Sequence, residues 1–214
     1  MAHFELTTAE TRILGSLLEK ERLVPESYPL SVNYLATACN QSTNREPVMS
    51  LSEQEIEAGL TSLREKRLAT MIHSSGSRVP KYRHNLPDHY ELAPREVALL
   101  CVLMLRGPQT PGELRQRTER MAAFPSVEEV ESALRGLMSG DEPLVRILPA
   151  RPGQKESRYV QLLSGEPVDA PPADPLHAAP RASKTEALET EIAALREDLR
   201  QLREEFAAFR KQFE

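Results

Sequence analysis

The chain has 214 residues, of which 40% are hydrophobic, 5% are aromatic and none is Trp, so any core must be mostly aliphatic. Its 27 Lys and Arg residues against 32 Asp and Glu residues give a net charge of −5, which excludes a strongly basic nucleic-acid clamp over the whole chain. The longest apolar run, 97–105, is too short to cross a membrane, and neither a signal peptide nor a cysteine motif is present. We therefore expect a cytoplasmic protein that makes no membrane contact.

The first predicted helix starts where Thr7 can form a capping box with Glu10. A short second helix is expected over 31–40. Two strand-like runs, 68–72 and 78–83, surround a polar tip and predict a hairpin. A third predicted helix precedes this hairpin and follows the second helix. Its apolar residues recur at i, i+4 and i+7: Ile56, Leu60 and Leu63.

The same order of elements is predicted a second time. Pro94 suits the first turn of a helix, a short helix is expected over 110–121, and strand-like runs follow at 144–148 and 157–163. The third helix again has an apolar stripe, Val130, Leu134 and Leu137. Ser at the same offset precedes both third helices as a candidate N-cap, Ser52 and Ser126.

Three helices and a hairpin in this order are typical of the winged-helix variant of the helix-turn-helix. We therefore predict an α+β fold, mostly α, with two tandem winged-helix domains at 1–90 and 91–164. A generic small α+β module with the same order is the alternative. A Pro- and Ala-rich linker is expected over 165–183, and a coiled-coil helix over 184–214.

The C-terminal segment has an unbroken heptad pattern, which specifies a left-handed coiled coil. Acidic g positions would face Arg196, Arg203 and Arg210 at the e positions of a parallel partner, so we predict a parallel homodimer. The alternatives are a higher oligomer, favoured by the terminal phenylalanines, and a single helix lying on the globular part. The predicted dimerisation residues are Leu188, Ile192, Leu195, Leu199, Leu202, Phe206, Phe209 and Phe213.

The sequence resembles the YceH-like family of bacterial proteins, a family of unknown function. The resemblance is carried by YPLSVN (28–33), ACNQ (38–41), TNREPVM (43–49), RGPQTPGELR (106–115) and ESRY (156–159). These motifs span the globular part. The resemblance implies tandem winged helices and brings no established catalytic or ligand-binding residues.

The charge pattern separates the third helices from the hairpins. Opposite the two apolar stripes lie faces of net charge −2 (54, 57, 58, 61 and 65) and −1 (128, 131, 132, 135 and 139), which disfavours the usual docking of these helices in a major groove. The hairpins, or wings, are basic and could contact phosphates; the alternative is solvated strand edges. Their candidate nucleic-acid-binding residues are Arg78, Lys81, Arg83, Arg146, Arg151, Lys155 and Arg158.

The polar segment 40–47 is a second candidate site. Its amides and guanidinium could read base edges or hold a peptide, and the alternative is a loop that hydrogen-bonds to itself. If the segment binds a ligand, changing Asn44 and Arg45 to Ala should abolish binding with little loss of thermal stability. The candidate residues are Asn40, Gln41, Asn44 and Arg45.

No phosphate loop, nucleophile elbow or zinc-protease motif is present, and the spacing of His73, His84, Asp88 and His89 matches no standard metal site. We therefore expect a protein that is not an enzyme and uses no cofactor or metal. The first interpretation is a dimeric regulator associated with double-stranded DNA or transcription. The alternative is an interaction scaffold whose acidic third helices dock a protein partner and do not bind DNA.

Overall fold

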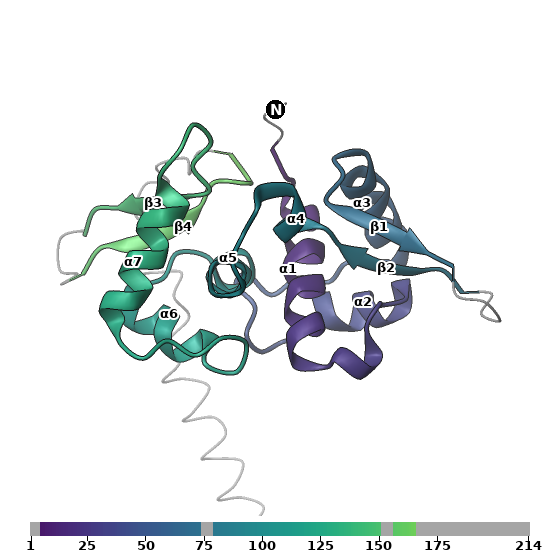
Figure 1. The fold of residues 1–214 in the computed structure, drawn as a ribbon. Helices are drawn as coiled ribbons and strands as arrows, with labels where there is room; N and C mark the ends of the chain where they lie inside the picture. The colour runs from purple at the N-terminus through teal and green to yellow at the C-terminus, as the bar shows by residue number, and fades with distance from the viewer. Residues whose placement is uncertain (1–4, 74–78, 151–155, 166–214) are drawn as a thin grey trace, which may run out of the picture. The chain divides into compact units, whose positions relative to one another are not determined.

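A computed structural model describes residues 5–73, 79–150 and 156–165. The first part of the chain forms α1 (Thr8–Leu23), η1 (Pro25–Ser27), α2 (Val32–Cys39), α3 (Glu53–Glu65), β1 (Ala69–Ile72) and β2 (Lys81–His84). After the short helix α4 (Leu86–Tyr90), the second part forms α5 (Pro94–Arg106), α6 (Pro111–Thr118), α7 (Val127–Met138), β3 (Val145–Leu148) and β4 (Arg158–Gln161). The fold is thus mostly helical α+β, with the order helix, helix, helix and hairpin occurring twice (Figure 1).

Most predicted helix starts are confirmed. Thr7 and Glu10 form the expected capping box, Pro94 begins α5, and Ser52 and Ser126 cap α3 and α7. Each cap satisfies backbone N–H groups that the first helical turn leaves without partners. The predicted linker beyond Gly165 and the predicted coiled coil, 184–214, lie outside the described residues.

The second short helix is shorter than the sequence predicts. It was expected over 110–121, but α6 ends at Thr118. The amides of Met121 and Ala122 both donate to the Thr118 carbonyl, at 2.8 Å each, so a hydrogen-bonded turn follows the last residue of the helix. The strand expected from residue 78 likewise starts only at Lys81.

The two hairpins have matching registers. In the first, Met71 pairs with Tyr82, and in the second, Ile147 pairs with Tyr159. An isolated antiparallel bridge adds one further residue to each hairpin, at the tyrosine in both cases: Leu30 to Tyr82 and Gln109 to Tyr159. Both bridging residues come from the connection between the first and second helix of their part, so the internal repeat extends to backbone pairing.

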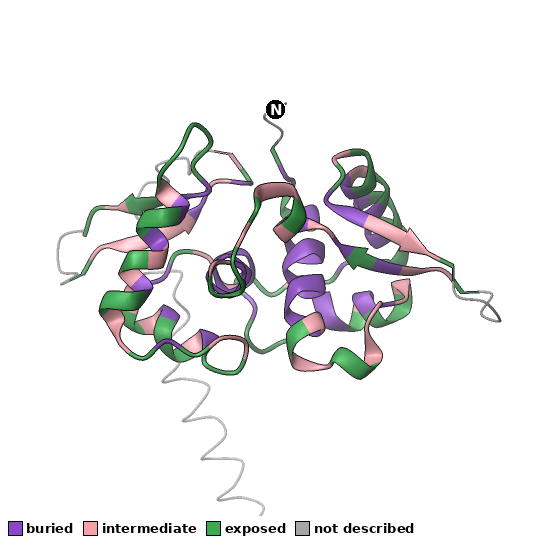
Figure 2. Ribbon diagram, viewed as in Figure 1, coloured by how far each residue is buried: buried purple, intermediate pink, exposed green. Residues whose placement is uncertain are grey.

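The first helices of the two repeats, α1 and α5, pack against each other in one shared hydrophobic core. Residues 10–20 of α1 and 97–105 of α5 are buried without interruption, as the purple helices of Figure 2 show. Gly15 permits the close approach, because a Cβ there would lie 2.9 Å from Leu105 Cδ2 and 3.1 Å from Met104 Cβ. The described residues accordingly belong to one compact unit. None of the helices described is long and apolar enough to span a membrane.

Candidate partner-docking site

The outward faces of α3 and α7 carry more carboxylates than cations. All three stripe residues of each helix are buried, as the sequence predicts. Opposite the α3 stripe, every residue of the predicted face is exposed. On α7, Glu128, Ser132 and Arg135 are exposed and Glu131 is half-buried. The acidic faces on the two third helices are therefore presented to solvent.

The first turns of these helices keep their carboxylates ionised. Hydrogen bonds from the backbone and side chain of Ser52 lower the pKa of Glu55, and a hydrogen bond from the Ser126 side chain lowers the pKa of Glu128. Negative side chains at a helix N-terminus are also stabilised by the helix dipole. Glu55 in the first turn of α3 and Glu128 on the α7 face therefore stay ionised at neutral pH and repel phosphate.

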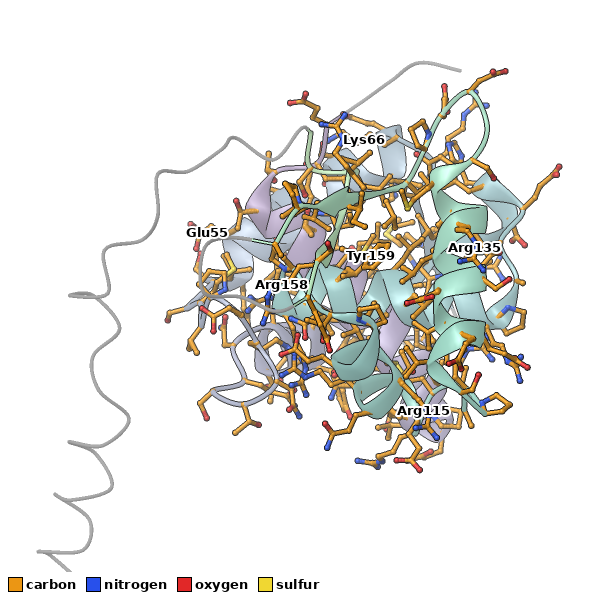
Figure 3. The ribbon with its side chains drawn as sticks, turned by 90° about the vertical axis from the view of Figure 1, so that its left-hand side faces the viewer. Glu55, Lys66, Arg115, Arg135, Arg158 and Tyr159 are labelled. Carbon is orange, nitrogen blue, oxygen red and sulfur yellow. The ribbon has the colours of Figure 1, made fainter. Side chains whose placement is uncertain are left out.

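A cavity of about 420 Å³ lies beside α7, between that helix, the start of α6 and the β3–β4 hairpin. Tyr159, on strand β4 of the hairpin, lines this cavity together with Val127 and Glu131 of α7 and is labelled in Figure 3. Burial raises the pKa of Tyr159, and the negative charge of Glu131 raises it further, whereas Arg135 acts in the opposite direction. The cavity combines apolar walls with two carboxylates; its lining includes Pro111, Val127, Glu131, Ile147, Glu156 and Tyr159.

The described hairpin cations do not form one basic surface. Arg83 and Arg146 are exposed and Lys81 is half-buried. Arg158, however, donates to Glu113 Oε2 at 3.0 Å and to the Pro108 carbonyl at 2.9 Å. The remaining candidates, Arg78, Arg151 and Lys155, lie outside the described residues. His84, on the same hairpin as Arg83, is buried against Glu21 at 3.0 Å.

The polar segment 40–47 makes extensive internal hydrogen bonds. Arg45 is buried and donates to both carboxylate oxygens of Glu19 and to the Ala38 carbonyl. The side chain of Asn40 accepts from the Leu51 amide and donates to the Leu51 carbonyl, at 2.7 and 2.8 Å. These contacts account for both side chains without a ligand. They also oppose the expectation that removing Arg45 leaves stability unchanged.

The same segment connects the two repeats. The Glu46 amide donates to the Leu105 carbonyl at 2.8 Å, and Arg106 donates to the Asn44 side chain. Gln41 is half-buried beside these residues in the chain. The sequence predicts a site here because polar residues gather in it. The structure shows that Glu19 of α1 pairs with Arg45, that α5 bonds to Asn44 and Glu46, and that Leu51 pairs with Asn40.

Sequence reasoning missed the polar side of α1 that holds this segment. Arg12 is 2% exposed and donates to the carbonyls of Cys39 and Pro47, and Ser16 contacts the Cys39 thiol. Arg12, Ser16 and Glu19 recur at i, i+4 and i+7, so they share one helix face. Three polar residues at helical spacing within an apolar helix were the signal that could have revealed it.

The described residues contain no group of three or more His, Cys, Asp or Glu side chains placed to hold a metal ion. A family model described as "Protein of unknown function, DUF480" matches residues 6–154. The chain belongs to this family. It is also similar to proteins named UPF0502 from Azoarcus sp. (strain BH72), 45% identical over 100% of this chain and 96% of the relative, and from Geotalea daltonii, 51% identical over 82% and 80%. These names assign no activity to the relatives.

Proposed function

We propose that this DUF480 protein is a tandem winged-helix adaptor that docks a protein partner through its acidic third helices. The winged-helix assignment is supported by the repeated element order and by the bridges from Leu30 and Gln109. In a winged helix, a short strand between the first and second helices pairs with the hairpin, and the two bridging residues occupy that position. Fold alone does not assign function, so the docking role is argued from the surface.

The observation that carries the docking role is the cavity beside α7 together with its carboxylates. The carboxylates of Glu131 and Glu156 line the cavity together with apolar side chains. Among these are Val127 and Ile147, and Ile147 is 41% exposed. This combination fits a segment that presents Lys or Arg beside an apolar side chain, because charge complementarity adds specificity to apolar burial. A DNA phosphate would meet repulsion at the same place.

The test is to titrate the full-length protein with a labelled peptide that alternates Lys with Leu, and separately with a labelled 20-base-pair duplex, by fluorescence anisotropy. We expect saturable binding of the peptide that weakens about tenfold in the double variant Glu131→Gln with Glu156→Gln, since two charged contacts are lost. Glu26→Gln, an exposed carboxylate on η1, is the matched control and should bind as wild type. Equal binding by the double variant and the control would refute the docking role.

The second candidate function, association with DNA, is supported by Arg83 and Arg146, which are exposed on the two hairpins. In that case the duplex should bind more tightly than the peptide, with a steep dependence on salt. Arg83→Ala together with Arg146→Ala should then reduce the slope of log affinity against log salt by about two. An unchanged slope would exclude the hairpins as the contact surface.

We further propose that residues 184–214 join two copies in a parallel coiled coil, so that an assembly would carry two docking cavities. The heptad pattern and the opposite charges at the g and e positions support this step. Linked sites bind a repeated or dimeric partner more tightly than one site does, provided that the linker lets both sites engage.

A further inference from the structure

A second cavity, of about 460 Å³, lies where the two repeats meet and is separate from the docking cavity. Its walls come from α1, from segment 40–47, from α5, and from α6 with the turn that follows it. The volume is within the range of small-molecule sites, about 300–1,000 Å³. Charged residues dominate the polar part of the lining, which includes Glu19, Asn44, Arg106, Arg117, Glu119 and Arg120.

Arg106 is the central cation of this cavity. It lies half-buried in the last turn of α5 and donates to the side-chain oxygen of Asn44, an uncharged acceptor. Within the described part of the chain, no carboxylate forms an ion pair with it. Burial lowers the pKa of Arg106, and the positive charge of the neighbouring Arg117 lowers it further, whereas the negative charge of Glu19 acts in the opposite direction. A partly buried guanidinium beside a second one is costly unless an anion joins them.

Three carboxylates lie in or near the cavity: Glu19, Glu113 and Glu119. Glu19 accepts a hydrogen bond from Arg45 at 2.6 Å and lies 3.2 Å from the Lys20 ammonium. Glu113 lies 3.5 Å from Arg117 but is closer to Arg158, at 3.0 Å. Glu119 also lines the cavity, so its lining carries three arginines, Arg106, Arg117 and Arg120, against two carboxylates. Because Glu19 is already paired with Arg45 and Lys20, the lining keeps an excess of positive charge.

We propose that this cavity binds a small phosphorylated organic molecule, with Arg106 and Arg117 holding the phosphoryl group. The guanidinium fork matches the oxygens of a phosphate and forms two parallel hydrogen bonds to it. The phosphoryl dianion would neutralise the two like charges. The floor of the cavity is apolar, from Cys101, Val102 and Leu105, and offers contact to an organic moiety that free phosphate lacks.

Because the site lies between the two repeats, a bound ligand would stabilise the whole folded unit. Asn44 belongs to the first repeat, whereas Arg106 and Arg117 belong to the second. A ligand held by all three would bridge the repeats next to the α1–α5 contact. Because such a ligand binds the folded state alone, it should raise the melting temperature in proportion to the logarithm of its concentration.

The test uses full-length protein, isothermal titration calorimetry and thermal denaturation, with inorganic phosphate, pyrophosphate, ATP, glucose 6-phosphate and citrate as probes. We expect at least one organic phosphate to bind about tenfold more tightly than inorganic phosphate and to raise Tm. Arg106→Gln and Arg117→Gln should each weaken that binding about tenfold or more, the loss typical of a charge-assisted pair. Arg64→Gln, on the exposed side of α3, is the matched control.

Arg117 lies on the cavity wall and is partly exposed, so its variant reports on binding even if Arg106→Gln weakens the fold. ATP and glucose 6-phosphate distinguish a nucleotide site from a sugar phosphate site. The proposal is overturned if none of the phosphate probes binds at millimolar concentration, if citrate binds as tightly as the organic phosphates, or if the control loses as much affinity as the two cavity variants.

Discussion

The guanidinium of Arg45 donates to both carboxylate oxygens of Glu19, at 3.0 and 2.6 Å, and the side chain of Arg45 is fully buried. Burial by itself raises the pKa of Glu19, but the hydrogen bonds and charge of Arg45 more than offset this effect, so the pKa is lowered. Glu19 therefore stays ionised inside the protein because Arg45 is there. The pair fixes segment 40–47 on α1.

Replacing Arg45 by Ala leaves the Glu19 carboxylate buried with Lys20 as its remaining cation. We expect the free energy of unfolding, measured by urea denaturation, to fall by about 3–5 kcal/mol, the usual cost of breaking a buried ion pair from one side. Arg22→Ala, an exposed arginine of the same helix, should change it by about 0.5 kcal/mol or less. A loss for Arg45→Ala no larger than that of the control would show that the loop does not depend on the pair.

His84 provides a prediction of pH dependence. Burial lowers its pKa, while the adjacent Glu21 carboxylate and Asp88 act in the opposite direction and Arg22 acts in the same direction as burial. Since the unfolded chain then binds the proton more readily than the folded one, the free energy of unfolding should decrease as pH falls below about 6.5. His84→Gln should flatten this decrease in urea titrations at pH 7.5, 6.5 and 5.5. His73→Gln, at the exposed end of the same hairpin, is the control; identical pH profiles for wild type and His84→Gln would contradict the assignment.

Among the elements, the contact between α1 and α5 depends most on a single position. Gly15→Val would force its side chain against Leu105 and Met104, so we expect a loss of about 1–3 kcal/mol or more of unfolding free energy by urea denaturation. Gly112→Ala is the control, because a Cβ there meets nothing within 4 Å and Ala favours a helix. If Gly15→Val is as stable as the wild type, α1 and α5 do not pack at this distance in solution.

The elements also show which features a sequence can predict. The stripes and caps of α3 and α7 follow from helical period and local capping, so their acidic outward faces were predictable. The buried polar face of α1 depends on distant partners: Arg12 donates to Cys39 and Pro47, and Arg45 reaches Glu19, 26 residues away. The cavity around Arg106 was not predictable, because it exists only once α1, α5 and α6 are packed together.

At the scale of the whole molecule, the proposed coiled-coil assembly would depend on charge positions in residues 184–214, which lie outside the described residues. In a parallel pair, Glu191, Asp198 and Glu205 at g positions face Arg196, Arg203 and Arg210 at e positions of the other chain. Each such pair contributes only about 0.2–1 kcal/mol. The pairs occur on both sides of the seam, however, so reversing all three arginines replaces every attraction with a repulsion.

The variant Arg196→Glu, Arg203→Glu and Arg210→Glu should therefore be monomeric at a protein concentration at which the wild type is dimeric, as measured by light scattering after size-exclusion chromatography. Its matched control is Arg200→Glu with Lys211→Glu, which reverses charge at the b and f positions, away from the seam. This control should still dimerise. If the triple variant also dimerises, another interface dominates over these charge pairs. If the wild type is monomeric at every concentration tested, the heptad pattern would instead belong to a single helix that lies on the globular part of its own chain.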